Sequence, residues 1–308
     1  MPISEKLKGH LGLFGANVCW GLMAPIAKTV MMAGVVTPLL LTDFRIVGAA
    51  VLFWILSLFT RREHVPAADL LRLAGAGMLG ILFNQGCYVF GVGLTSPGEA
   101  SIITTTMPMW VMVLSRAILG APVTWRKALG IGLGASGAVT LVWSSSGASG
   151  GNSSVTGDLL VFGAQLSYAL YLTLYKNFLA KYSLVTLMKW MFTFAAVAVL
   201  PFSVRSIAAT QWCAVAPSTW LGVAYVVFMG TFVAYILMMT GQKRLMPTVV
   251  GMYNYFQPVV ATGVGLALGL DTFTAGKAAA VVLIFGGVYL VTAATPDLPR
   301  QSSTSSRS

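Results

Sequence analysis

The stretch GHLGLFGANVCWGLMAPIAK, Gly9–Lys28, recurs in altered form as GDLLVFGAQLSYALYLTLYK, Gly157–Lys176. The two stretches share the opening Gly, a Phe-Gly-Ala triplet, a Leu and the closing Lys, and polar Asn17 aligns with polar Gln165. Self-similarity at a fixed distance along a chain is the signature of a repeated structural unit. The sequence therefore predicts two copies of one architecture.

The likeness continues down the chain at a constant distance of 150 residues, in four further matched pairs. Each copy holds five apolar stretches, and because five is odd, the two copies must cross a membrane in opposite orientations. We predict an all-α integral membrane protein with ten transmembrane helices as two inverted five-helix repeats. The expected units are residues 1–148 and 149–296, followed by a disordered cytoplasmic tail, 297–308. The matched pairs are Pro97 and Pro247, Pro108 and Pro258, Lys127 and Lys277, and Gly137 and Gly287.

Composition independently excludes an ordinary soluble domain. The chain has 308 residues, of which 57% are hydrophobic and 9% charged, and its mean hydropathy is +0.82. A membrane-spanning helix needs about 20 apolar residues, or roughly 30 Å of helix. Ten such stretches can be marked, approximately at 10–30, 37–59, 70–93, 98–118, 127–143, 157–178, 183–202, 218–240, 248–269 and 275–294.

The net charge of +11 is explained by orientation in the membrane. Fourteen Lys and Arg residues lie in one set of alternate connections, whereas the opposite set holds only Lys28, Arg205 and Lys277. Basic residues concentrate on the cytoplasmic side of membrane proteins. We therefore expect both termini in the cytoplasm of a multi-pass protein of the plasma membrane, in a bacterium the inner membrane, and no nucleic-acid partner.

Two prolines lie near the centres of the fourth and ninth expected helices. A proline inside a helix removes one backbone hydrogen bond and frees the carbonyl four residues earlier. Pro108 would free the carbonyl of Thr104, and Pro258 would free that of Asn254. Inverted-repeat transporters bind their solutes near the midplane, where such interrupted helices meet. We therefore expect both prolines to act as hinges.

Amide and hydroxyl side chains lie beside aromatic ones near the middle of five expected helices. Residues three or four apart share one helix face, so these groups could line one cavity. The alternative is hydrogen bonding and packing between helices, because such side chains often join helices in lipid. The candidate binding residues are Asn17, Trp20, Gln85, Tyr88, Thr104, Gln165, Tyr168, Tyr171, Tyr253, Asn254 and Gln257, with Trp20 and Tyr171 as apolar walls.

Three ionisable residues lie inside expected helices: Asp43, Arg45 and Lys189. Asp43 and Arg45 are two apart, so they leave different sides of the helix, and Lys189 lies close to the place where the repeat would put the counterpart of Asp43. Each is one to two turns from a helix end. We expect them to gate the transport path, with Asp43 as the candidate proton site, while extension to the interface stays an alternative.

Glycines fill the fifth and tenth expected helices. Small residues allow two helix backbones to approach closely. We therefore expect these helices to pack against each other or against a neighbour. The glycines are Gly130, Gly132, Gly134 and Gly137 in the fifth helix, and Gly286 and Gly287 in the tenth.

Catalytic and cofactor motifs give no support to an enzyme. The chain has no Walker motif, no Cys, His and carboxylate cluster with metal-ligand spacing, and only two histidines, His10 and His64. Gly134-Ala135-Ser136-Gly137 matches the G-x-S-G of intramembrane serine proteases, but such a serine needs a histidine base in the membrane. We expect no enzyme activity, no metal and no cofactor.

The whole arrangement resembles the EamA-type branch of the drug/metabolite transporter superfamily. Two departures stand out. Ala121 replaces an acidic residue that many members carry, and Asn17 stands in the first helix, where small multidrug members have a glutamate. The resemblance is carried by Asn17-x-x-Trp20-Gly21, Pro25, Phe44-Arg45, Thr104–Pro108, Leu119-Gly120, Gln257-Pro258 and Gly269-Leu270-Asp271.

The resemblance implies two inverted repeats, alternating access, and movement of small metabolites without ATP. Together with the uncharged, aromatic candidate cavity, it predicts a secondary transporter or facilitator for a small neutral or zwitterionic metabolite, with amino acids favoured and export expected. Its partners would be the substrate and the lipid bilayer, with protons as an optional coupling ion, and it would work as a monomer. Two alternatives stay open: efflux of cationic drugs in the same fold, and a membrane receptor or scaffold that transports nothing.

Overall fold

The computed structural model describes residues 4–94, 103–145, 155–267 and 274–294, and within these ranges the chain forms helices and no strand. The predicted tail 297–308 lies outside the described residues. The α-helices are α1 (Glu5–Met32), α2 (Pro38–Leu58), α3 (Ala67–Gly77), α4 (Asn84–Leu94), α6 (Met107–Leu119), α7 (Trp125–Ser145), α8 (Val155–Leu174), α9 (Leu184–Ala209), α10 (Pro217–Val227), α11 (Ala234–Arg244), α12 (Pro247–Met252), α13 (Phe256–Ala267) and α14 (Ala275–Ala293).

Short turns of other helix types interrupt or join these helices. A π-helical turn, η1 (Met78–Phe83), joins α3 to α4, and a second, η4 (Phe228–Val233), joins α10 to α11. The two begin 150 residues apart, at the distance of the sequence repeat. Three 3₁₀ turns complete the list: η2 (Phe178–Ala180), η3 (Trp212–Ala214) and η5 (Tyr253–Tyr255), the last between α12 and α13.

Six helical stretches are long and apolar enough to cross a membrane, which makes the chain a multi-pass membrane protein. Helix α6 is a shorter apolar helix. The remaining expected spans fall on α1, on α7 and on the interrupted stretch α12–η5–α13, and their crossing stays a prediction. The six stretches are Pro38–Leu58, Ala67–Gly91, Val155–Leu174, Leu184–Ala209, Pro217–Arg244 and Ala275–Ala293.

Local sequence explains where several helices begin. Ser4, Thr37, Ser183 and Thr274 stand directly before α1, α2, α9 and α14, and each side-chain oxygen accepts a hydrogen bond from a backbone N–H of the first turn. Such caps satisfy donors that a helix start leaves free. Helix α6 ends at Gly120, whose φ of +64° favours glycine.

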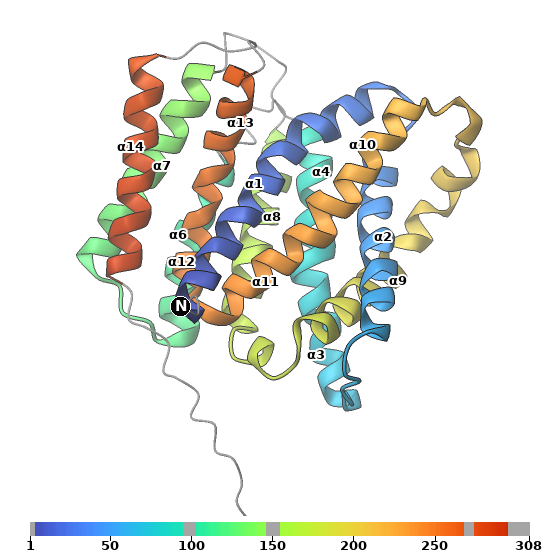
Figure 1. Cartoon of the computed structure of the whole chain (residues 1–308), viewed down its shortest axis with the longest axis horizontal. Coiled ribbons are helices and arrows are strands. Elements are labelled where there is room, and N and C mark those ends of the chain that lie inside the picture. The colour runs from blue at the N-terminus through green and yellow to red at the C-terminus, as the bar shows by residue number, and fades with distance from the viewer. Residues whose placement is uncertain (1–3, 95–102, 146–154, 268–273, 295–308) are drawn as a thin grey trace, which may run out of the picture.

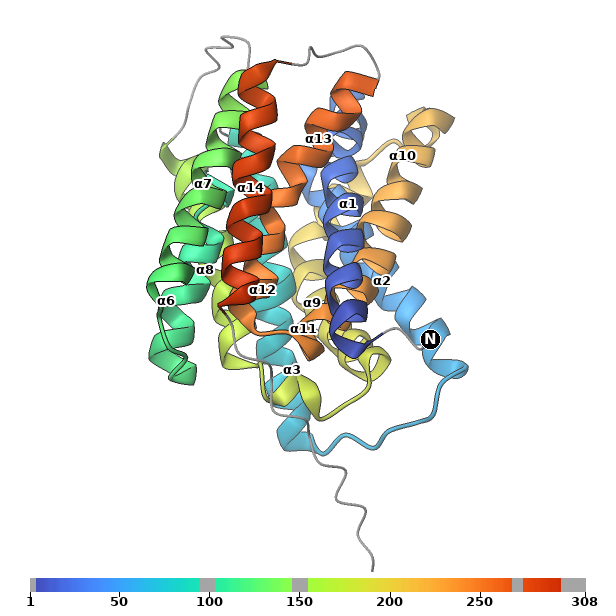
Figure 2. The same ribbon diagram turned by 60° about the vertical axis from the view of Figure 1, so that its left-hand side comes forward.

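Helices from the first half of the chain pack mainly on helices from the second half. Helix α1 runs beside α11 and α13, while α8 packs on α4 and α6. Helix α2 pairs with α9, and α7 pairs with α14. Figures 1 and 2 show the α7–α14 pair side by side at one end of the bundle, and α2 with α9 at the other end in Figure 1. Neither half therefore forms its core alone.

The α7–α14 pair confirms the close packing predicted from the glycines. A Cβ atom on Gly130 would lie 2.8 Å from the carbonyl oxygen of Gly287, and one on Gly287 would lie 2.5 Å from that of Gly130. Gly134 and Gly137 also face neighbours too close for a Cβ, whereas Gly132 and Gly286 face open space. The packing therefore needs only some of the glycines.

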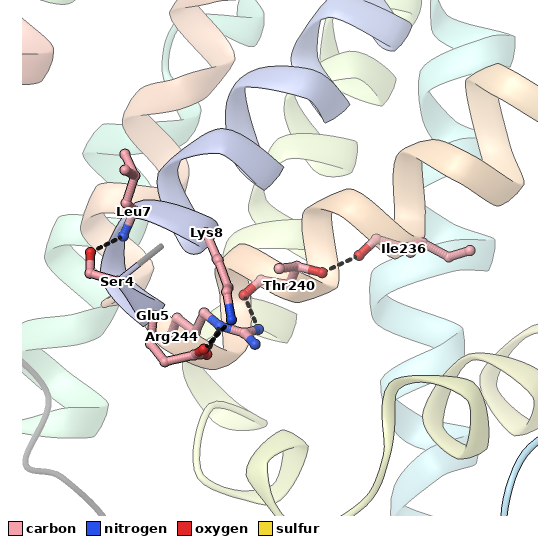
Figure 3. A network of polar contacts seen from close by, with 7 residues as sticks. All are labelled: Ser4, Glu5, Leu7, Lys8, Ile236, Thr240 and Arg244. Carbon is pink, nitrogen blue, oxygen red and sulfur yellow. Dashed lines mark hydrogen bonds and ion pairs between the residues drawn. The ribbon is translucent and has the colours of Figure 1, made fainter. Parts of the chain in front are cut away.

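Side chains also tie α1 to α11 at the end of the bundle where the described chain begins (Figure 3). The Glu5 carboxylate accepts hydrogen bonds from Lys8 Nζ at 2.6 Å and Arg244 Nε at 2.8 Å. These two cations hold the pKa of the Glu5 carboxyl below its usual value. Arg244 also donates to the carbonyl of Thr240, so its side chain bonds the last turn of α11 as well as α1.

Substitution of Gly287 by Ala should destabilise the protein, whereas substitution of its neighbour Gly286 should not. The new methyl at position 287 overlaps the backbone of α7, and overpacking of this kind costs about 1–3 kcal/mol. The same change at position 286 meets nothing within 4 Å. Thermal unfolding of both variants in lipid nanodiscs measures the difference. Equal midpoints for the two variants would contradict the packing.

Candidate functional site

The middle of the α10–η4–α11 stretch has two carbonyls that bond to side chains. A π-helical turn disturbs the regular backbone ladder, and in a membrane the freed groups must find partners in the protein. The Thr231 hydroxyl donates to the carbonyl of Val226 at 2.9 Å, and Trp20 Nε1 donates to that of Gly230 at 3.0 Å. Helix α1 is thereby held against the π turn.

Carbonyls of the other π turn, η1, accept hydrogen bonds from side chains of the second half of the chain. Ser167 on α8 donates to the carbonyl of Leu79 at 2.8 Å, and the Tyr235 hydroxyl lies 3.4 Å from that of Gly80. A Cβ on Gly80 would overlap the ring of Tyr171 on α8. Both π turns therefore lie in contact with the other half of the chain.

Gln85 and Tyr235, which are 150 residues apart, join the halves directly. Gln85 Nε2 donates to the Tyr235 hydroxyl at 2.8 Å. Gln85 is 3% exposed, and its Oε1 has no hydrogen-bond partner among the described residues. Trp20 and Phe192 stand edge-on to the Tyr235 ring, with centroids 5.8 and 5.0 Å away. An amide oxygen able to accept a hydrogen bond thus lies among aromatic rings.

Helix breaks occur at both predicted prolines, but each proline begins a helix instead of kinking one. Pro108 lies in the first turn of α6, after a turn at residues 105–106, and Pro258 lies in the first turn of α13, after η5. The carbonyl of Thr105, next to the expected Thr104, accepts a hydrogen bond from the Tyr255 hydroxyl at 3.1 Å. These two residues are also 150 apart.

Three predicted amide residues lie on facing stretches of α1 and of the chain around η5. Gln257 Nε2 donates to Asn17 Oδ1 at 3.0 Å, and Asn17 Nδ2 donates to the carbonyl of Leu13 at 2.8 Å. Asn254 is 8% exposed, and its Oδ1 lacks a hydrogen-bond partner in the described part of the chain. The interhelical bonding considered as an alternative therefore accounts for Asn17 and Gln257, but not for Asn254.

Three predicted tyrosines lie nearer the end of the bundle where α1 begins. The Tyr168 hydroxyl accepts from Gln242 Nε2 at 2.8 Å, and the Tyr171 hydroxyl donates to Gln242 Oε1 at 3.0 Å. The Tyr253 hydroxyl lies 2.8 Å from His10 Nδ1. All three phenols thus already have hydrogen-bond partners.

Three other candidates are Gln165, Tyr88 and Thr104. Gln165 is buried, whereas Tyr88 and Thr104 are half-buried. Tyr88 lies one turn from Gln85 on α4, and α4 packs on α2, the helix that carries Arg45.

The three charged residues have different environments. Arg45 is buried, and its Nε donates to the Thr231 hydroxyl at 3.1 Å, so it points into the bundle and does not extend to the interface. Asp43 is buried as well: its Oδ1 accepts from Ser203 at 2.8 Å, and its Oδ2 has no partner among the described groups. Lys189 is half-buried, with its ammonium 4.8 Å from the centre of the Trp54 ring.

The sequence reasoning missed four residues of this core: Tyr235, Thr231, Gln242 and His10. For Tyr235 a signal existed, because adding the repeat distance to Gln85 leads to it. His10 lies at the edge of the first apolar stretch and carried no signal. Ser136, of the protease-like motif, is exposed and donates to the carbonyl of Leu133 in its own helix. Within the described residues no group of three His, Cys, Asp or Glu could hold a metal ion.

An all-helical, multi-pass membrane protein with polar groups buried in its helix breaks fits a transport family, and comparison with known proteins identifies one. The model of the EamA-like transporter family matches residues 7–143 and again residues 155–293. The chain belongs to the EamA-like transporter family.

Its relatives are described as transporters. The uncharacterized transporter YetK of Bacillus subtilis (strain 168) is 21% identical over 94% of this chain and 88% of its own length. The uncharacterized inner membrane transporter YedA of Escherichia coli (strain K12) is 26% identical over 91% of this chain and 89% of its own. A protein crystal structure aligns with a TM-score of 0.76 at 20% identity, covering 94% of this chain and 96% of that one.

Substitution of Tyr255 by Phe should destabilise the protein by about 1–2 kcal/mol, because the carbonyl of Thr105 loses its donor in a buried helix break. Tyr289 is a matched control: it is exposed, and Tyr289→Phe should leave the unfolding midpoint unchanged. Thermal unfolding in nanodiscs tests both. The contact is unimportant if the two variants unfold at the same temperature.

Proposed function

We propose that the protein is a secondary transporter or facilitator that moves a small neutral or zwitterionic metabolite across the bacterial inner membrane, with amino acids favoured and export as the direction. One observation carries the proposal. Gln85 Oε1 and Asn254 Oδ1 are buried acceptors without partners among the described residues. An unpaired polar group in a membrane interior is costly. A substrate that donates hydrogen bonds would satisfy both.

Ten membrane crossings in two inverted five-helix repeats, residues 1–148 and 149–296, are the architecture we propose. The double match of the family model supports it. So do the contacts of Gln85 with Tyr235 and of Tyr255 with Thr105, because each joins positions 150 residues apart. Residues related by a two-fold axis touch each other only when they lie on that axis. Since the repeats already pair within one chain, a monomer suffices, and the charge distribution supports cytoplasmic termini.

Alternating access is the proposed mechanism, with the chain bending at Pro108 and Pro258. Polar contacts support assigning this structure to a state closed at the cytoplasmic side. Lys181 and Tyr182 both donate to the Asp69 carboxylate, which ties the α8–α9 connection to α3. Lys243 on α11 donates to the carbonyl of Tyr182. Inward opening would have to break this cluster. Asp43 is the residue proposed for proton coupling.

Counterflow into liposomes tests the function. The purified full chain is reconstituted, the vesicles are preloaded with pooled unlabelled amino acids, and the uptake of each labelled amino acid is measured with and without a pH gradient. We expect uptake of at least one amino acid, and a pH effect would indicate proton coupling. Absence of uptake of any amino acid beside a working control transporter would contradict the proposed substrate class.

Replacement of Asn254 by Ala should raise the half-saturating substrate concentration about tenfold, since one buried hydrogen bond is worth about 1 kcal/mol or slightly more. Gln257 bonds to Asn17, so Gln257→Ala should raise the same concentration by releasing the Asn17 amide. Ser136→Ala removes a polar group from the exposed face of α7 and serves as control. Counterflow at graded substrate concentrations gives the values. Unchanged affinity in both folded variants would place the substrate elsewhere.

A further inference from the structure

Arg45 is a charged side chain buried in the middle of the molecule. It is 6% exposed, and its Nε contacts Thr231 of η4, halfway along the stretch Pro217–Arg244. No described carboxylate lies within ion-pair distance of its guanidinium. Asp43, two residues away, bonds to Ser203 instead. The positive charge of Arg45 is therefore not neutralised by the described residues.

An unneutralised guanidinium inside a membrane protein calls for a partner. A buried cation costs several kcal/mol unless it is paired and hydrogen-bonded. Arginines within membrane spans are therefore rare, and they mark substrate or ion pathways. A purely structural role would need only the Nε contact, which holds Thr231 in the π turn. It would not need the rest of the guanidinium group.

The contact with Thr231 leaves one edge of the guanidinium available. The Thr231 hydroxyl donates its own proton to the carbonyl of Val226, so its oxygen can accept from Arg45 Nε. The four Nη hydrogens have no partner among the described residues. The two Nη atoms form a planar fork that matches a carboxylate in two parallel hydrogen bonds. The bond to Thr231 also fixes the direction of that fork.

The stretch η4–α11, which bonds Arg45 through Thr231, also holds a hydrogen-bond acceptor. Tyr235 follows Thr231 by four residues, about one turn further along this stretch. Tyr235 in turn accepts a hydrogen bond from Gln85, whose Oε1 is buried without a described partner. The unpaired cation and the unpaired acceptor are therefore bonded to two residues that lie one turn apart, Thr231 and Tyr235. This combination is complementary to a ligand with a carboxylate at one point and an N–H donor at another.

We propose that Arg45 binds the carboxylate of the transported metabolite, and that Gln85 Oε1 accepts a hydrogen bond from its amino group. The inference rests on the proposed function and narrows it to α-amino acids and similar zwitterions. Cationic compounds without a carboxylate are disfavoured by the charge of Arg45. The proposed site therefore contains one cation, in place of the uncharged cavity expected from the sequence.

Binding of acid and amide pairs tests the site. The full chain in nanodiscs is titrated with L-leucine and L-leucinamide, L-phenylalanine and L-phenylalaninamide, and L-serine and L-serinamide, and the shift of the unfolding midpoint yields dissociation constants. At least one acid should bind to the wild type more tightly than its amide. In Arg45→Gln the dissociation constant of that acid should rise at least about tenfold, while that of the amide changes little.

Two further variants make the result decisive. Arg205→Gln removes an exposed arginine from the far end of α9 and should keep the preference for the acid. Arg45→Lys keeps a cation without the fork and should lose part of the preference; it replaces Arg45→Gln if that variant does not fold. A preference for the acid that is unchanged in the folded Arg45 variants, or absent from the wild type, overturns the proposal.

The counterflow assay separates this proposal from the proposed function. Acid binding that depends on Arg45, without counterflow of any amino acid, contradicts transport and supports the site. Counterflow with no difference between acids and amides contradicts the site and supports transport. Failure of both assays beside working controls overturns both proposals.

Discussion

Backbone groups inside a membrane must be satisfied by the protein itself, and this constraint organises the structure. The chain breaks its helices at η1, at η4, before α6 and at η5. Carbonyls at these breaks accept hydrogen bonds from side chains of another helix or of the same turn. The described donors are Trp20, Ser167, Thr231, Tyr235 and Tyr255. Four of these five donors belong to the other half of the chain from the carbonyl that they bond. The helix breaks thus also hold the two halves together.

Much of the fold could be predicted because the chain repeats itself and because composition limits the choices. The pairing of α7 with α14 followed from glycine content, since only close backbone contact requires residues such as Gly130 and Gly287. The breaks before α6 and at η5 followed from two prolines, whereas no sequence signal predicted the π turns η1 and η4. The exact form of the breaks at the prolines did not follow, because whether a proline kinks a helix or starts a new one depends on the residues before it. At Pro108 a turn at residues 105–106 decides for a new helix.

The site was harder to predict. Helices that are apolar on all sides give no indication of which face points inward, so depth along the helix was the only guide for Arg45. The position of Arg45 along its helix suggested a place near the membrane–water interface. In the structure, α2 is oriented so that the Arg45 side chain reaches Thr231 of η4. Tyr168 lies one turn from Gln165 and one turn from Tyr171, as helical spacing requires, but Gln242 bonds to the hydroxyls of both tyrosines. Partners from distant segments, such as Tyr235 and Gln242, cannot be read from local spacing.

The contact between Gln85 and Tyr235 has a consequence for motion. If the two halves exchange their conformations, as inverted repeats permit, contacts away from the symmetry axis must break on one side and form on the other. A contact between equivalent positions maps onto itself under that exchange. Gln85 and Tyr235 can therefore stay bonded while the helices around them tilt. The ties of Glu5 and Asp69 join positions that the repeat does not make equivalent, so under the proposed alternating access they would open in each cycle.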